Sequence, residues 1–236
     1  MKLDKSFEGA ALSKGRDHRV TEALLLTGSD KVHRHRFDQL YRQIFDSFWQ
    51  DATVDVFEVG VYQGASHNAW KSLVGRDGHV AGFDCDSRPE TLYSDVAHYQ
   101  GDQGSRTDLQ KTANIYGVRT FDLVIDDGSH AMLHQKQTFE VFWSCVRVGG
   151  WYVCEDLHTS GLITRSPELA ARYNPTDEPE TALDYFLRLA RESACRRGEV
   201  DEESGIKTLL PSMQFTFFSD AVAIRKMHDG RRWLWR

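Results

Sequence analysis

The stretches FDLVIDDGSH, residues 121–130, and GGWYVCEDLHTS, residues 149–160, decide the fold of this chain. In each, an apolar run typical of a strand ends in carboxylates that are followed by a histidine. Asp127 ends the first run, and Glu155 and Asp156 end the second. With no Lys or Arg near them in either stretch, such carboxylates repel one another unless a cation lies among them. Three oxygen ligands suit Mg²⁺, so the two stretches predict a metal site at the mouth of an α/β sheet.

Strand-type and helix-type patterns alternate along the chain, which predicts a parallel sheet with helices on both of its faces. Two apolar runs near the C-terminus, 213–219 and 221–227, are typical of an antiparallel hairpin. This combination is the shape of a class I methyltransferase, an α/β (Rossmann-like) fold with a mostly parallel seven-stranded sheet. The parallel strands are expected within residues 54–66, 79–86, 96–104, 121–128 and 149–157.

Length and composition indicate one large α/β domain, or one domain with a lid, because 236 residues that are 40% hydrophobic can bury a substantial core. We expect a helical cap over residues 1–50 and the methyltransferase domain over residues 51–236. Residues 161–181 are mostly polar and contain Pro167, Pro175 and Pro179, so we expect a lid or substrate loop there.

Charge and hydropathy exclude several classes of partner. The net charge is −6 and the sequence has no basic stripe, so nucleic acid is not an expected partner. No apolar run approaches the length that spans a membrane, and the N-terminus has no signal-peptide core. The four cysteines show no CxxC spacing and are typical of reduced packing residues. These features predict a cytoplasmic protein with a small-molecule substrate.

The stretch EVGVYQGAS, residues 58–66, surrounds the first strand-to-helix turn. Its glycines allow the backbone to approach a ligand closely, although a glycine turn by itself is common in α/β proteins. Asp84 closes the second strand, where a carboxylate can bond both ribose hydroxyls, and Asp102 follows the third, where it can meet an adenine amino group. Together these features predict a nucleoside site. The assigned cofactor-binding residues are Glu58, Gly60, Tyr62, Gly64, Ser66, Asp84, Asp102 and Gln103.

The spacing and charge of the turn select between two nucleoside cofactors. A nicotinamide dinucleotide site has GxGxxG spacing, which places a pyrophosphate on the helix N-terminus, and Gly60 and Gly64 do not have that spacing. Glu58 precedes the turn, where a carboxylate would repel a pyrophosphate but suits a cationic sulfonium that carries an amino group. We therefore expect S-adenosylmethionine rather than a nicotinamide cofactor.

Six short blocks occur along the chain in a characteristic order, and together they resemble the metal-dependent sugar O-methyltransferases of antibiotic biosynthesis. Those enzymes methylate deoxysugars on macrolides and related glycosides. The DDGSH and EDLHTS blocks are the specific part of the resemblance, whereas the glycine turn is generic. The six blocks are LTGSDK (26–31), FEVGVYQGAS (57–66), GFDCD (82–86), GDQGS (101–105), VIDDGSH (124–130) and EDLHTS (155–160).

The resemblance implies specific roles for the acidic blocks. By match, Asp127, Glu155 and Asp156 hold Mg²⁺, His130 is the general base, and Asp126 lies on the cofactor side. It also implies S-adenosylmethionine as the methyl donor and a homo-oligomer, which the apolar residues of the RRWLWR tail, 231–236, also favour. The lid and the N-terminal region differ most from the family, so the chemistry transfers better than the substrate does.

The function expected from these observations is S-adenosylmethionine- and Mg²⁺-dependent O-methylation of a sugar hydroxyl, on a deoxysugar nucleotide or on a glycosylated natural product. A catechol-like phenol offers a metal two adjacent oxygens as well, and a nicotinamide-dependent oxidoreductase would use the same crevice. Several roles stay open. Lys31 either closes over the cofactor or lies in a solvated loop, His158 either orients substrate or a carboxylate or packs, and His35 is given no role.

Overall fold

The computed structural model describes residues 18–48, 53–74, 76–116, 120–195, 199–201, 206–208 and 213–227. The RRWLWR tail and the first 17 residues of the expected cap lie outside these ranges, and the homo-oligomer stays a prediction. The helices are α1 (Arg19–Thr27), α2 (Asp38–Ser47), α3 (Ala65–Val74), α4 (Arg106–Tyr116), α5 (Met132–Phe142), α6 (Thr159–Leu162), α7 (Pro167–Tyr173) and α8 (Ala182–Cys195). The strands are β1 (Val56–Val59), β2 (Val80–Asp84), β3 (Ala97–Gln100), β4 (Phe121–Asp126), β5 (Val146–Cys154), β6 (Glu199–Asp201), β7 (Ile206–Thr208), β8 (Met213–Phe218) and β9 (Ala221–Lys226).

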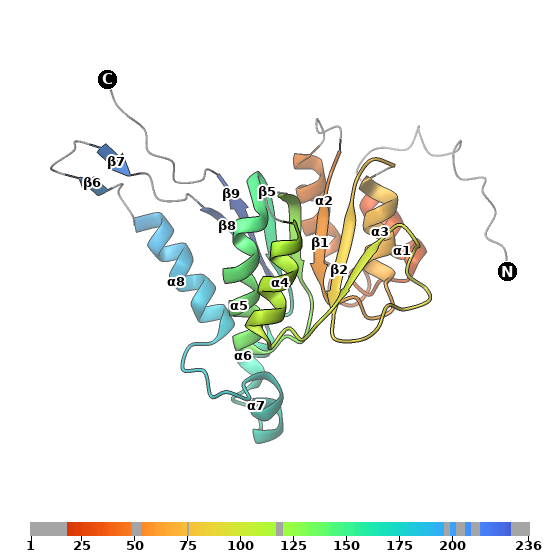
Figure 1. Ribbon diagram of the computed structural model, residues 1–236. Helices are drawn as coiled ribbons and strands as arrows, with labels where there is room; N and C mark the ends of the chain where they lie inside the picture. Colours follow the sequence, from red (N-terminus) through yellow and green to blue (C-terminus); the bar gives the residue numbers. More distant parts are fainter. Residues whose placement is uncertain are drawn as a thin grey trace.

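Seven strands form one sheet in the order β3-β2-β1-β4-β5-β9-β8 (Figure 1). The first five strands in this order pair in parallel, and β9 and β8 are antiparallel to their neighbours. All residues of β1 and β4 are buried, because helices cover both faces of the sheet at its centre. The predicted α/β fold with a C-terminal hairpin is thus confirmed.

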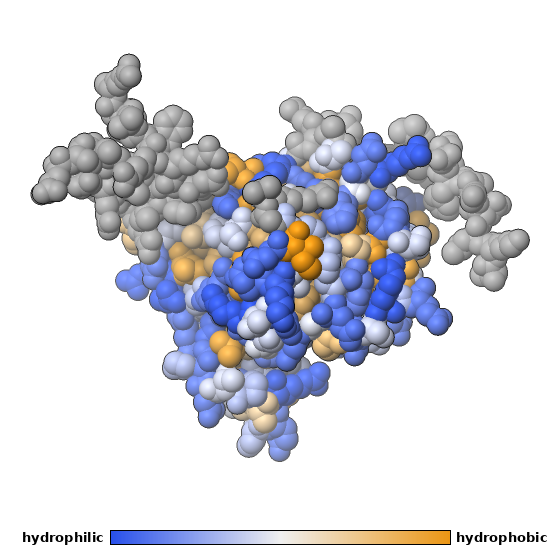
Figure 2. Space-filling view, in the orientation of Figure 1, coloured by the Kyte–Doolittle hydropathy of each residue, from blue (hydrophilic) through white to orange (hydrophobic). Residues whose placement is uncertain are grey.

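Two hydrophobic clusters fill the space between the sheet and its helices. On one face, Leu24 of α1, Tyr41 of α2 and Trp70 of α3 pack against the sheet. On the other face, α4, α5 and α8 cover the strands, with Phe139 and Phe186 among the buried residues. The face seen in Figure 2 is mostly hydrophilic with scattered hydrophobic residues, as expected for helices that bury one side only.

The strand order reverses between β1 and β4, which lie side by side in the sheet. In an open α/β sheet, ligands bind at the carboxyl ends of the strands where the order reverses. Here β1 ends at the glycine turn, β4 ends at Asp126, and the adjacent β5 ends at Cys154, just before Glu155. The fold therefore gathers the predicted cofactor and metal residues at one edge.

Several elements differ from the expectations. Residues 19–27 form α1, a helix within the range of the expected cap for which no separate bounds are predicted, and the expected lid over residues 161–181 contains α7 and the last part of α6. The strand β5 begins at Val146, three residues before the expected start at residue 149, because the chain enters it directly from a short 3₁₀ turn. Within the described residues, no helix combines the length and the hydropathy that a membrane span requires.

Candidate cofactor and metal site

The glycine turn after β1 brings the backbone against the end of β4. Gly60 has a φ of +96°, and a Cβ atom added there would lie 2.0 Å from the backbone oxygen of Asp127. A side chain at this position would therefore be strained by the φ angle and would also clash with the backbone. This position therefore requires glycine. The close approach of the two backbones puts Asp127, a predicted metal ligand, directly beside the predicted cofactor loop.

Asp84 at the end of β2 holds the turn from the neighbouring strand. Its Oδ2 accepts hydrogen bonds from the backbone N–H groups of Val61 at 2.6 Å and Tyr62 at 2.9 Å, and its Oδ1 accepts one from Asp86 at 3.0 Å. Burial acts to raise the pKa of Asp84, but these backbone donors outweigh it, and the pKa is lowered. Asp84 is therefore an ionised acceptor, as the assigned ribose-binding role requires.

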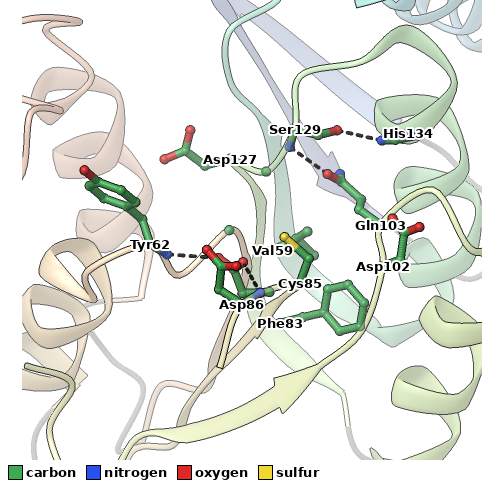
Figure 3. Close-up of a pocket in the computed structure, with 13 residues that line it drawn as sticks. Val59, Tyr62, Phe83, Cys85, Asp86, Asp102, Gln103, Asp127, Ser129 and His134 are labelled. Atoms are coloured by element: carbon green, nitrogen blue, oxygen red, sulfur yellow. Dashed lines mark hydrogen bonds between the residues drawn. The ribbon is translucent and has the colours of Figure 1, made fainter. Parts of the chain in front are cut away.

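Two adjoining cavities open at the carboxyl ends of the strands. The first has a volume of about 260 Å³, with Tyr62 on one side and Asp102, Gln103 and His134 on the other (Figure 3). The second has a volume of about 220 Å³ and is lined by residues of the turn and by the segment from Gly28 to Lys31. The residues that line both cavities are Gly60, Tyr62 and Asp127.

Gln103 is fixed at the wall of the first cavity by three hydrogen bonds. Its Nε2 donates to Asp126 Oδ1 at 2.7 Å and to Thr138 Oγ1 at 3.0 Å, and its Oε1 accepts from the backbone N–H of Ser129 at 2.8 Å. Asp126 is predicted on the cofactor side, but it is buried beneath Gln103 and lines neither cavity. It acts on the first cavity as a positioning residue, through Gln103 and through the backbone N–H of Gly128, which donates to Asp126 Oδ1 at 3.4 Å.

Lys31 enters the site from the connection between α1 and α2. Its Nζ lies 2.5 Å from Asp127 Oδ2, 2.7 and 2.8 Å from the two carboxylate oxygens of Glu155, and 3.3 Å from Glu58 Oε1. The side chain is only 1% exposed, so the solvated-loop interpretation is wrong. The interpretation that no basic side chain lies near these acids is also wrong, because residues distant in sequence meet here.

Glu155 and Glu58 are buried in the layer beneath the cavities. The hydroxyl of Tyr41 donates a hydrogen bond to Glu155, in addition to the contact with Lys31. Glu58 Oε2 accepts hydrogen bonds from Ser66 Oγ at 2.9 Å and from Trp70 Nε1 at 2.7 Å. Glu58 lines neither cavity, although it is predicted to contact the cofactor. Ser66, which lines the second cavity, lies between Glu58 and that cavity.

Asp156 lies among three histidines. His130 Nε2 is 3.3 Å from its Oδ2, and Nδ1 of His35 and of His158 lie 3.4 and 3.6 Å from its Oδ1. Side-chain atoms of Asp127, His130 and Asp156 all lie within 4.8 Å of one another, a spacing that suits a metal ion. The structure thus brings Asp127 and Asp156, two of the predicted metal ligands, together with the predicted base His130. The third predicted ligand, Glu155, is not in this group and contacts Lys31 and Tyr41 instead. His35, which was given no role, lies beside Asp156.

Backbone strain coincides with this cluster. His130 and Asp156 have φ angles of +59° and +56°, and Tyr62 has +48°, which few residues other than glycine adopt. Such conformations cost free energy, and they persist where the surrounding structure fixes them, commonly at functional sites. His130 and Asp156, which both have this conformation, contact each other through their side chains.

The charges of this region do not balance. Burial acts to lower the pKa of Lys31, but the charges of Asp127, Glu155 and Glu58 outweigh it and raise the pKa well above its usual value. Burial and the charge of Asp127 raise the pKa of Glu155 well above its usual value, against the opposing effect of Lys31. These pKa shifts show that acids outnumber the one ammonium here, an imbalance that a proton on Glu155 or a second cation would offset.

Comparisons with known proteins agree with this architecture. No family model matches the sequence. The chain is 33% identical over 187 residues to 8-demethyl-8-alpha-L-rhamnosyl tetracenomycin-C 2'-O-methyltransferase of Streptomyces olivaceus. The aligned region covers 76% of this chain and 47% of that protein. It is also 35% identical over 178 residues to demethylmacrocin O-methyltransferase of Streptomyces fradiae. That aligned region covers 72% of this chain and 42% of that protein.

A solved structure extends the likeness to three dimensions. The chain superposes on the MycE methyltransferase of the mycinamycin biosynthetic pathway, in complex with Mg, SAH and mycinamycin VI, with a TM-score of 0.69 and 25% identity. The superposition covers 88% of this chain and 54% of MycE, so the chain spans about half the length of the relatives it matches. In sequence and in fold, the chain is therefore similar, over about half of their length, to sugar O-methyltransferases of antibiotic biosynthesis, one of which was solved with Mg and SAH.

Proposed function

We propose that this chain is an S-adenosylmethionine- and Mg²⁺-dependent O-methyltransferase that acts on a sugar hydroxyl of a glycosylated natural product. The observation that carries the proposal is the meeting of the two cavities at Gly60, Tyr62 and Asp127. The cluster of Asp127, His130 and Asp156 begins at that junction. A bound methyl donor that fills both cavities would thus present its reactive centre beside acids and a base.

The residues present fit a divalent cation. Asp127 and Asp156 offer hard oxygen ligands, and Glu155 precedes Asp156 in the same block. Asp156 Oδ1 and His130 Nδ1 are buried and have no hydrogen-bond partner among the described residues. Buried polar atoms that lack partners are costly, so these atoms favour a ligand in the site. A divalent ion held by Asp127, Glu155 and Asp156 would lower the pKa of a coordinated sugar hydroxyl and fix the position of its oxygen.

The contacts of His130 support its proposed role as the base. A sugar hydroxyl is a poor nucleophile until its proton is removed, and methyl transfer needs the oxygen in line with the donor. The imidazole of His130 lies against Asp156, and the positive φ angle of His130 directs it there. An imidazole is a suitable base near neutral pH, and the contact with Asp156 would stabilise the imidazolium formed when His130 takes the proton.

The shape and charge of the cavities support S-adenosylmethionine over a nicotinamide dinucleotide. Asp84 and Asp102 lie in the first cavity, where they suit a ribose and an adenine. The second cavity is lined by Ser66 and Lys31 and lies above Glu58, a surrounding that suits the amino and carboxylate groups of an amino acid. A pyrophosphate at the turn would meet the carboxylate of Asp127, with the buried Glu58 one layer behind, and this negative charge disfavours it.

The names of the similar proteins indicate a class of substrate. The proteins matched above are named for methylation of a rhamnosyl group on tetracenomycin and of demethylmacrocin. We therefore infer that the sugar is already attached to its aglycone when it is methylated, in preference to a nucleotide-linked deoxysugar or a catechol-like phenol.

A transfer assay with labelled S-adenosylmethionine tests the proposal. The acceptor panel contains macrolide and aromatic-polyketide glycosides, deoxysugar nucleotides and catechols, each assayed with Mg²⁺ and with EDTA. We expect labelled product from a glycoside only, and its loss in EDTA. Transfer to a catechol or a nucleotide sugar would overturn the substrate assignment, and full activity in EDTA would overturn the role of the metal. Calorimetry with SAH and with NAD⁺ provides the control for cofactor choice.

A further inference from the structure

Lys31 is unusual because its ammonium is almost fully buried and contacts two of the carboxylates that are proposed to bind the metal. Its Nζ contacts Asp127 Oδ2 at 2.5 Å and both oxygens of Glu155 at 2.7 and 2.8 Å. A third acid, Glu58, lies 3.3 Å away. Lys31 belongs to neither acidic block, and it reaches the site from the connection between α1 and α2.

We propose that Lys31 is a built-in competing cation: its ammonium and the divalent ion share the carboxylates of Asp127 and Glu155, so Lys31 sets the metal affinity of the site. The proposal rests on the proposed function, because it concerns the same metal site. It makes Lys31 a positioning residue, since it acts through Asp127 and Glu155.

The geometry supports competition because the ammonium contacts both oxygens of Glu155 and one of the two oxygens of Asp127. A divalent ion bound to these carboxylates would lie close to the ammonium, and two cations a few ångströms apart in a buried site repel strongly. The ion would then bind against this repulsion or displace Lys31. Either route lowers metal affinity relative to a site with a neutral side chain at position 31.

The same contacts give Lys31 a second effect. Glu58 and Glu155 are buried, with 0% and 2% exposure, and acids in such surroundings repel one another unless a cation lies among them. The ammonium holds the ligand set together without a metal, so its removal destabilises the metal-free protein. Bound metal would restore the lost stability, because it supplies the missing positive charge.

The local backbone keeps Lys31 in this position. Ser29 N–H donates to Leu24 O at 2.9 Å, and Phe37 N–H donates to Lys31 O at 2.7 Å, which ties both ends of the segment to the adjoining helices. Phe37 is fully buried in the core. The ammonium is therefore presented by a fixed segment rather than by a freely moving side chain.

The test measures Mn²⁺ affinity by electron paramagnetic resonance, and the melting temperature with and without Mn²⁺, in the wild-type protein and in Lys31→Met, Lys31→Gln and Lys31→Arg. We expect both neutral variants to bind Mn²⁺ more tightly, on the order of tenfold. Without metal, we expect the melting temperature of both neutral variants to be lower than that of the wild type. Addition of Mn²⁺ should raise their melting temperature by more than it raises that of the wild type. Lys31→Gln keeps a hydrogen-bond donor, so it serves if Lys31→Met does not fold.

Two controls separate charge from packing. Tyr41→Phe removes the other donor to Glu155 without changing charge, and Lys71→Met removes a distant lysine that contacts Gly78 O and Asp95. Neither control, nor Lys31→Arg, is expected to bind Mn²⁺ tenfold more tightly. Unchanged or weaker binding in both neutral variants overturns the inference alone, provided that the wild type binds Mn²⁺. A wild-type protein that binds SAH but no Mn²⁺ overturns the metal site itself, and with it the metal-dependent part of the proposed function.

Discussion

Nε2 of His130 lies 3.3 Å from Oδ2 of Asp156, and both residues have left-handed backbone conformations. The two residues come from the loops after neighbouring strands β4 and β5, so the parallel sheet brings them together. A base beside a carboxylate that also serves a metal can accept a proton and keep the resulting charge balanced. This pair underlies the first two predictions.

Replacement of His130 by alanine is expected to lower turnover by roughly 10²- to 10⁴-fold, the usual contribution of a general base. Binding of SAH should be unchanged, because His130 lines neither cavity. Methyl-transfer kinetics and calorimetry measure the two quantities. The matched control is His33→Ala, which removes an exposed histidine from the connection between α1 and α2. Near-normal turnover in His130→Ala would show that another group takes the proton.

Replacement of Asp156 by asparagine is expected to weaken Mn²⁺ binding by more than about tenfold, because a charged oxygen ligand becomes neutral. SAH should bind as it does in the wild type, since Asp156 also lines neither cavity. Titration calorimetry with each ligand measures both. Asp95→Asn is the control, because the Asp95 side chain is largely exposed and contacts Lys71 away from the site. Unaltered Mn²⁺ affinity in Asp156→Asn would remove Asp156 from the ligand set.

Replacement of Gly60 by alanine is expected to destabilise the fold by at least about 2 kcal/mol, since it combines an unfavourable φ angle with a backbone clash. The new Cβ would lie 2.0 Å from the Asp127 oxygen, so the junction of the two cavities must distort and SAH binding should fall. Urea unfolding and calorimetry measure these effects. Gly161→Ala is the control, because a Cβ there meets no atom within 4 Å. Equal stability of the two variants would contradict the assigned geometry.

Asp126 is expected to make stability depend on pH. Burial, opposed by the hydrogen bond from Gln103, raises its pKa from 3.8 to about 7. The folded protein therefore binds a proton more tightly than the unfolded chain does, so this group favours folding below pH 4. That contribution is lost as the pH rises through about 7. Asp126→Asn cannot titrate, so urea unfolding between pH 4 and 8 should show a flatter profile for it than for the wild type. Identical slopes would refute the raised pKa.

The sequence pattern predicts the sheet because the central strands are short apolar runs that end in glycine or in an acidic residue. The fully buried β1 and β4 carry that signal, and Asp84, Asp127 and Asp156 follow the ends of such runs. The helical cap is predicted without the bounds of α1, although Val20, Ala23 and Leu24 lie at helical spacing and are buried, a local pattern that marks this helix.

The part of the site that sequence reasoning missed depends on contacts between distant segments. Lys31 is 96 residues from Asp127 and 124 residues from Glu155, and no local pattern links them. His35 likewise meets Asp156 only after the connection between α1 and α2 folds over the sheet. The one signal for Lys31 was its place in the LTGSDK block, which matched the family but suggested no partner.

The most direct measurement is an anomalous difference map at the manganese edge, from crystals grown with Mn²⁺ and SAH. The account predicts one strong peak bounded by Asp127, Glu155 and Asp156, with SAH extending from the cavity of Asp84 to the cavity of Ser66. A map without a peak among these three acids, in crystals where SAH occupies both cavities, would contradict it.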